Sequence, residues 1–188
     1  MKKSLAGMHI AILATDMVEE SELVDPRQAL EDAGATTDLV APKEGEIITA
    51  NHADKSESYP VDATFDEIEA TDYDGVLIPG GVFNADQLRI DPQAQHFIQP
   101  IDEAGKPVAV ICHGAWLLIS AGLVDGRTLT SYHTIADDVM NAGGEWQDKP
   151  VVIDENWVSS RNPDDIPQFN VAMINLFAQI HQSGGLLV

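Results

Sequence analysis

Residues 107–122, PVAVICHGAWLLISAG, join an apolar β-rich run to a helical pattern, and the chain's only cysteine, Cys112, lies at the junction. In open parallel α/β sheets, ligands collect beyond the carboxyl ends of the strands. A sharp strand-to-helix turn at that edge lifts a side chain out of the fold, and Gly114 leaves room for such a turn. A lone cysteine on an apolar strand is ordinarily a small buried hydrophobe. The Cys-His-Gly turn favours a reactive thiol instead.

The expected helix start bears directly on that thiol. Unpaired N–H groups at a helix N-terminus place positive potential beside the sulfur. In this setting the pKa of a thiol falls from about 8.5 to ~3.5–7.5, which predicts a thiolate at neutral pH. His113, the next residue, is the expected proton acceptor.

Short apolar runs alternate with helical patterns along the rest of the chain, which predicts a mostly parallel sheet covered by helices on both faces. The expected strands are 9–15, 36–42, 45–51 (an edge strand), 73–81, 107–112 and 127–132, with a hairpin over 150–160 that turns at 154–156. The expected helices are 21–34, 91–105 (capped by Asp91), 113–122, 134–144 and 164–182, with residues 183–188 as a frayed tail.

Size and charge limit the classes of function. The length of 188 residues suits a single domain over 1–188. The 31 acidic and 10 basic residues give a formal charge of −21, which disfavours nucleic acid and anionic membranes as partners. No apolar run is long enough to cross a bilayer. A single cysteine sets no oxidising requirement, so the cytoplasm is the expected location.

Two further segments are expected at the edge that carries Cys112. Backbone N–H groups of Gly80 and Gly81 are candidates for half of an oxyanion hole, with the N–H of His113 as the other half; a plain tight turn is the alternative. The acidic residues after the first strand, Glu19, Glu20 and Glu22, are commonly helix caps, and at least two of them are expected to be only that. No metal spacing and no nucleotide-binding glycine motif is present, so neither a metal nor a cofactor is expected.

With these segments in view, the chain resembles the PfpI family of the class I glutamine-amidotransferase-like superfamily. The resemblance runs from about residue 8 to 180 and rests on EESEL, LIPGG, VAVICHG, NAGGEW and VVIDENWVSSRNP. It implies a flavodoxin-like three-layer sandwich with a nucleophile elbow, a reactive Cys112 and His113 beside it. It also implies that Asp86 completes a Cys-His-acid set from a neighbouring subunit, and therefore a homodimer or homohexamer.

The resemblance further implies that Glu19 is the buried acid that touches the thiol. A carboxylate beside a thiolate is a like-charge pair, so one member is expected to hold a proton. Protonated Glu19 would then donate a hydrogen bond to the sulfur.

These expectations support two hypotheses of different classes. The first is a cysteine-dependent stress-response enzyme that attacks reactive carbonyls, in the glyoxalase or deglycase manner, or peptide bonds, in the manner of an intracellular peptidase. Its partner would be a small carbonyl or a peptide or protein substrate. The alternative is a non-catalytic redox sensor or chaperone-like protein that works through oxidation of Cys112.

Overall fold

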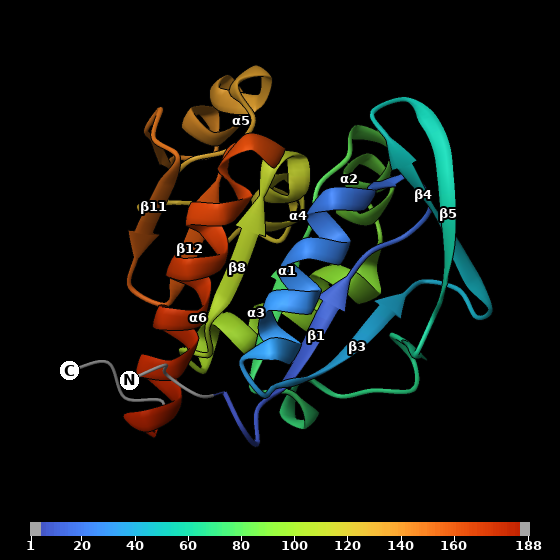
Figure 1. Ribbon diagram of the computed structural model, residues 1–188. Coiled ribbons are helices and arrows are strands. Elements are labelled where there is room, and N and C mark those ends of the chain that lie inside the picture. The colour runs from blue at the N-terminus through green and yellow to red at the C-terminus, as the bar shows by residue number, and fades with distance from the viewer. Residues whose placement is uncertain (1–4, 185–188) are drawn as a thin grey trace.

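The computed structural model describes residues 5–184, so the last four residues of the tail expected to fray lie outside the described residues. A seven-stranded sheet forms the middle of the molecule, in the order β11-β12-β8-β7-β1-β3-β6 (Figure 1). Its strands are β1 (His9–Leu13), β3 (Thr36–Ala41), β6 (Ala63–Thr64), β7 (Gly75–Ile78), β8 (Val108–Ile111), β11 (Val151–Asp154) and β12 (Trp157–Ser160). The predicted α/β architecture with a mostly parallel sheet is confirmed.

All neighbouring strands in this sheet are parallel except β11 and β12, which form the expected antiparallel hairpin. The central strands β7 and β8 are buried along their whole length. Side chains of β1 alternate between the two faces, with Ile10 and Ile12 in one core and Ala11 and Leu13 in the other. Strands that are buried on both faces read as continuous apolar runs, which is why the sequence located them.

Helices cover both faces of the sheet. The helices are α1 (Glu20–Asp32), α2 (Val82–Arg89), α3 (Pro92–Glu103), α4 (Ala115–Ser120), α5 (Ala136–Asn141) and α6 (Ile166–Gln182), with short 3₁₀ turns η1 (Ala70–Asp72), η2 (Cys112–Gly114), η3 (His133–Ile135) and η4 (Pro163–Asp165). In Figure 1, α1 and α6 lie in front of the sheet, and their apolar side chains share one core. Side chains of α2 to α5 belong to the other core. The carboxylate of Asp91 caps α3, as expected, by accepting from two backbone N–H groups.

The order of the strands in the sheet indicates where a ligand is expected to bind. From β1 the chain continues to β3 on one side of the sheet, whereas β7 pairs with β1 on the other side and leads on to β8. The strand order therefore reverses between β1 and β7. In open α/β sheets, binding sites lie outside the carboxyl ends of the strands at this point. The turns after β1, β7 and β8 meet there.

Two small sheets differ from the expectation. The segment 45–51 is not an edge strand of the main sheet; as β4 (Glu46–Asn51) it pairs with β2 (Val18–Glu19) and β5 (Asp54–Pro60). Strand β5 was not predicted, because almost all of its side chains are exposed and apolar and polar residues do not alternate along it. The expected strand over 127–132 contains only β9 (Thr128–Leu129), which pairs with β10 (Glu145–Trp146).

Candidate active site

Cys112 lies on a tight turn between β8 and α4, with a backbone φ of +63°. A non-glycine residue in this left-handed region is uncommon and strained, so the surrounding structure must hold it there. The turn packs closely against the end of β7, because a Cβ on Gly114 would lie 2.7 Å from the carbonyl oxygen of Ile78. The structure thus has the nucleophile-elbow geometry that the sequence predicted at this position.

The carboxyl group that meets the thiol is Glu22, not the expected Glu19. The Glu22 side chain is fully buried beside Cys112, close enough for each group to shift the pKa of the other. Its Oε2 also accepts from the backbone N–H of Gly80 at 2.8 Å. Glu19 turns to the β4–β5 hairpin instead, and its Oε2 accepts from the N–H of His52 at 2.9 Å.

The helical phase explains this correction. Glu19 belongs to β2, and α1 begins at Glu20. Within α1, Glu22 is on the same buried stripe as Pro26 and Leu30, because residues four apart share one face of a helix. That spacing of four was a signal in the sequence that Glu22 points inward.

Burial governs the electrostatics of the pair. It raises the pKa of Glu22 to about 8. Burial also raises the pKa of the Cys112 thiol, an ionised Glu22 raises it further, and the backbone N–H groups of Gly81 and His113 lower it. The expectation that the pKa of Cys112 falls to ~3.5–7.5 is therefore wrong, because burial raises the pKa of this thiol. At neutral pH, Glu22 carries a proton and does not oppose the sulfur electrostatically.

The hydrogen bonds of Glu22 agree with its protonated form. Its Oε1 is buried and accepts from no donor among the described residues. A buried carboxylate oxygen without a donor is costly. A protonated carboxyl lowers that cost, because a proton on Oε1 removes the buried charge while Oε2 keeps the bond from Gly80.

His113 stands beside the sulfur, with its Nδ1 3.2 Å from Cys112 Sγ. Its ring stacks on Tyr132 at 4.7 Å between centroids and meets Trp116 edge-on at 5.3 Å. Burial, and secondarily the neighbouring His133, lower the pKa of His113 to about 4. The imidazole is therefore neutral at pH 7 and can accept a proton from the thiol.

The donors expected for an oxyanion hole are divided between two tasks. The N–H groups of Gly81 and His113 both point at Cys112. The N–H of Gly80 is occupied by Glu22, so the structure removes it from the expected set. Gly81 has a φ of +86°, and a Cβ there would lie 2.6 Å from the backbone nitrogen of Glu19, so this position requires glycine.

The structure does not bring Asp86 to His113 within one chain. Asp86 is exposed on α2 and is not among the residues that line the cavity over Cys112. Its expected contact across a subunit boundary stays a prediction.

A cavity of about 740 Å³ opens above Cys112. Its lining residues are Glu19, Glu22, His52, Ala53, Gly81, Val82, Phe83, Cys112, His113, Tyr132, Thr134, Asn162, Pro163 and Asp164. Cys112 is only 6% exposed, yet it faces this space. The volume is typical of sites for small molecules.

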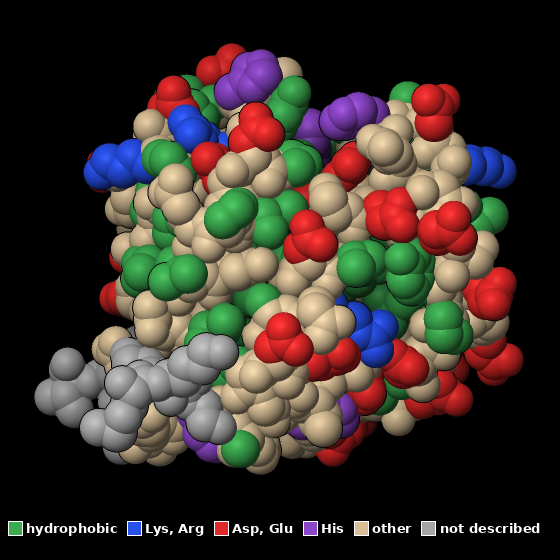
Figure 2. Space-filling model, in the orientation of Figure 1, with side chains coloured by type: hydrophobic (Ala, Val, Ile, Leu, Met, Phe, Trp, Pro, Cys, Tyr) green, Lys and Arg blue, Asp and Glu red, His purple; other side chains and the backbone are tan. Residues whose placement is uncertain are grey.

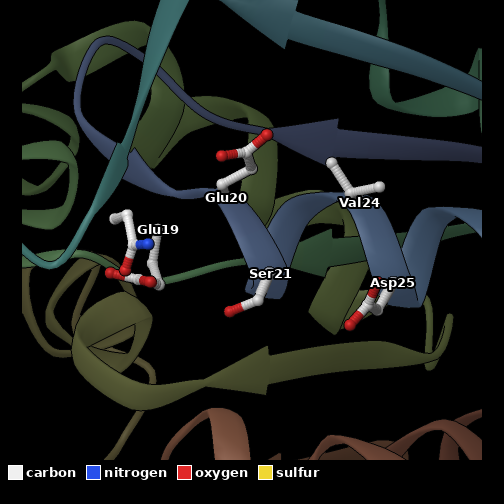
Figure 3. A pocket seen from close by; sticks show the side chains of 6 residues that line it. Glu19, Glu20, Ser21, Val24 and Asp25 are labelled. Atoms are coloured by element: carbon white, nitrogen blue, oxygen red, sulfur yellow. The ribbon is translucent and has the colours of Figure 1, made fainter. Parts of the chain in front are cut away.

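A second, smaller cavity of about 300 Å³ adjoins the start of α1. Figure 3 shows the side chains of Glu19, Glu20, Ser21, Val24 and Asp25 around it. It contains no thiol or imidazole, so the chemistry belongs to the larger cavity. Glu19 lines both.

Comparison with known proteins shows which family this chain belongs to. Residues 8–176 match the DJ-1/PfpI family. The chain belongs to this family. It is 41% identical to the deglycase PfpI of Pyrococcus furiosus over 159 residues, which is 85% of this chain and 93% of that one. It is 38% identical to YraA of Bacillus subtilis, whose name describes a candidate cysteine protease, over 89% of this chain and 96% of that one.

A solved structure of the same family confirms the fold. A two-domain protein from Anabaena variabilis, with DJ-1/ThiJ/PfpI-like and ferritin-like domains, superposes with a TM-score of 0.84 at 31% identity. The match covers 94% of this chain and 48% of that protein. The family resemblance inferred from the sequence motifs is therefore confirmed.

Within residues 5–184, no group of three or more His, Cys, Asp or Glu side chains is arranged to hold a metal ion. In the same part of the chain, no helix has the length and hydropathy needed to cross a membrane. Figure 2 shows Asp and Glu side chains scattered over one face and far fewer Lys and Arg.

The raised pKa of Glu22 predicts a pH-dependent contribution to stability. Between about 4.3, the ordinary value for Glu, and about 8, the folded chain holds a proton on Glu22 that the unfolded chain has lost. The free energy of unfolding therefore falls as the pH rises through this window, by up to about 1.4 kcal/mol per pH unit. Glu22→Gln cannot titrate. Urea unfolding at pH 5 to 8 should show wild type losing stability relative to Glu22→Gln, and a difference that stays constant with pH would contradict the assignment.

Proposed function

We propose that this chain is a cysteine-dependent enzyme that converts small reactive carbonyl compounds or the adducts that they form on proteins. One observation carries the proposal: Cys112 Sγ faces a cavity of about 740 Å³ and lies 3.2 Å from a neutral imidazole nitrogen. A thiol paired with a base is the arrangement of covalent catalysis at carbonyl carbon. The name of the relative from P. furiosus, a deglycase, supports the same chemistry.

Methylglyoxal illustrates the proposed steps. The sulfur of Cys112 bonds to the aldehyde carbon as the C=O π bond breaks, and His113 transfers the thiol proton to the oxygen. His113 then takes the proton from this carbon and returns it to the adjacent carbon, while the hydroxyl proton moves from the first oxygen to the neighbouring ketone oxygen. The product is a thioester of lactate. Water cleaves the thioester, restores the thiol and releases lactate. The net reaction adds one water and needs no oxidant or reductant.

Neighbouring groups have separate roles in this scheme. The N–H groups of Gly81 and His113 already point at Cys112, so they are placed to stabilise a developing oxyanion beside the sulfur. Protonated Glu22 donates to the sulfur and stabilises its anionic form. Glu19 holds the turn of the β4–β5 hairpin, through the His52 N–H, where that turn lines the cavity.

Peptide-bond cleavage uses the same thiol and base, and the name of YraA supports it. The cavity favours the carbonyl substrate, because its volume matches a small molecule or one modified side chain.

A redox sensor is the second candidate function, and the isolation of Cys112 favours it. Cys112 is the chain's only cysteine, so no second thiol can convert a sulfenic acid into an internal disulfide. Oxidation by peroxide would then continue to sulfinic acid. Oxygen atoms on the sulfur would have the N–H groups of Gly81 and His113 and the Glu22 carboxyl as donors.

The decisive experiment measures lactate formed from methylglyoxal by the purified protein, alongside hydrolysis of a fluorogenic peptide. The proposal predicts lactate in catalytic excess over protein. Peptide hydrolysis without lactate formation would show that the chain is a peptidase and not a carbonyl-converting enzyme. No turnover of either substrate, together with a gain of two oxygen atoms on Cys112 in dilute peroxide, would replace it with the sensor.

Variants of Glu22 test its proposed role. Glu22→Gln keeps an acceptor for Gly80 and a donor for the sulfur, so iodoacetamide should alkylate Cys112 at pH 7 within a few-fold of the wild-type rate. Glu22→Leu removes the donor, and a hydrogen bond to a charged group contributes about 1.5–3 kcal/mol, which predicts roughly 10- to 100-fold slower alkylation. Circular dichroism controls for folding. Equal alkylation rates in the two variants would exclude a donor role for Glu22.

A further inference from the structure

The second nitrogen of His113 has a partner within the same chain. His113 Nε2 lies 3.4 Å from Oγ1 of Thr134, a residue of η3 at the exposed rim of the cavity. This contact is long for a hydrogen bond, but such bonds are often long in unliganded active sites and tighten when substrate binds.

The segment that carries Thr134 is tied to the elbow. The backbone N–H of Tyr132 donates to the carbonyl oxygen of Cys112 at 3.2 Å. The Tyr132 ring stacks on the imidazole of His113. The start of η3 therefore holds the plane of the imidazole and sets a hydroxyl at its outer nitrogen.

A neutral imidazole carries one proton, and its position decides what His113 can do. Only a ring protonated on Nε2 presents a lone pair on Nδ1, the nitrogen that faces Cys112 Sγ. The Thr134 hydroxyl can accept from Nε2–H or donate to an unprotonated Nε2. The Cys112 thiol can donate to Nδ1 only when the ring proton is on Nε2, and Thr134 then acts as the acceptor. The hydrogen-bond partners of the two ring nitrogens together fix the tautomer.

We propose that Thr134 is a positioning residue that holds His113 in the Nε2–H tautomer and so keeps Nδ1 free to accept the thiol proton. The inference rests on the proposed function for its consequence but not for its geometry. It assigns within one chain the task that the family resemblance assigned to Asp86 of a neighbouring subunit.

The hydroxyl differs from a carboxylate in one chemical respect. A carboxylate at Nε2 would stabilise imidazolium, whereas a hydroxyl can accept from Nε2–H without adding charge. The Thr134 arrangement therefore suits a base that must stay neutral until the thiol proton arrives.

The test reads the tautomer directly. In protein labelled with ¹⁵N-histidine, the ring nitrogen shifts of His113 at pH 7 distinguish the two tautomers, and the His113 signals are assigned by their absence from His113→Asn. Wild type should show the Nε2–H form. Thr134→Val, which has the same shape without the hydroxyl, should show a mixture with the Nδ1–H form, and Thr134→Ser should restore the wild-type spectrum.

Kinetics provide the second readout. Loss of one neutral hydrogen bond, about 1 kcal/mol, predicts that Thr134→Val lowers the alkylation rate and kcat/KM for methylglyoxal about fivefold, with recovery in Thr134→Ser. The tautomer measurement needs no turnover, so the proposal about Thr134 can fail or survive independently of the carbonyl reaction. Asp86→Asn is the competing variant. An unchanged tautomer in Thr134→Val, or a tautomer altered by Asp86→Asn alone, would overturn the proposal.

Discussion

Replacing Cys112 with alanine is expected to reduce lactate formation from methylglyoxal to the uncatalysed background, a loss on the order of 10³-fold or more. The reason is chemical: no other side chain among the residues that line the cavity is a thiol, and the chain contains no second cysteine. The measurement is kcat/KM for wild type and variant at equal protein concentration.

Cys112→Ser is the matched control for shape. It keeps a small polar side chain at the strained backbone position, yet a hydroxyl is a far weaker nucleophile at neutral pH. Both variants should retain the wild-type circular dichroism spectrum. Lactate formation that persists in folded Cys112→Ala would remove Cys112 from the mechanism and, with it, the proposed function.

Replacing Gly80 with alanine is expected to cost about 3 kcal/mol of stability, at the upper end of the usual cost of overpacking, and to disrupt the thiol site. A Cβ on Gly80 would lie 2.5 Å from Glu22 Oε2, 2.7 Å from Cys112 Cβ and 2.9 Å from the backbone nitrogen of His113. Two of these atoms belong to the elbow itself, so relief requires the elbow to move. Urea unfolding and the alkylation rate of Cys112 measure the two effects.

Gly122→Ala is the control for the general cost of adding a methyl group. A Cβ at Gly122 meets nothing within 4 Å, but its φ of +76° makes alanine strained, which costs about 1–2 kcal/mol. Gly122→Ala should therefore lose some stability and keep normal alkylation of Cys112. Gly80→Ala that is as stable as wild type and alkylated at the wild-type rate would show that the site is looser than these distances indicate.

Most of the fold could be predicted because its signals are local. The buried strands β1, β7 and β8 are short apolar runs, and Asp91 precedes α3 as a cap. The hairpin strand β5 could not, because its exposed side chains leave no periodic pattern. Its place follows from pairing with β4, which is a property of the assembled chain.

The candidate site divides in the same way. Cys112 and His113 were predicted from one continuous motif. The family resemblance assigned the buried acid to Glu19. Which of Glu19 and Glu22 points inward depends on where α1 begins, and no local pattern gives that residue. The backbone N–H of Gly80 was expected to be free for an oxyanion, but it donates to Glu22, which lies 58 residues earlier in the chain. The sequence gives no sign of this contact.

By itself, the sequence determined the strand-to-helix turn that carries the thiol, the adjacent imidazole and the family, since each depends on neighbouring residues. Only the tertiary structure decided which carboxyl meets the sulfur, which backbone donors remain free and that Thr134 reaches the outer nitrogen of His113. These contacts join segments that are far apart in the chain, and burial then sets their protonation. No local pattern encodes either the distance or the burial.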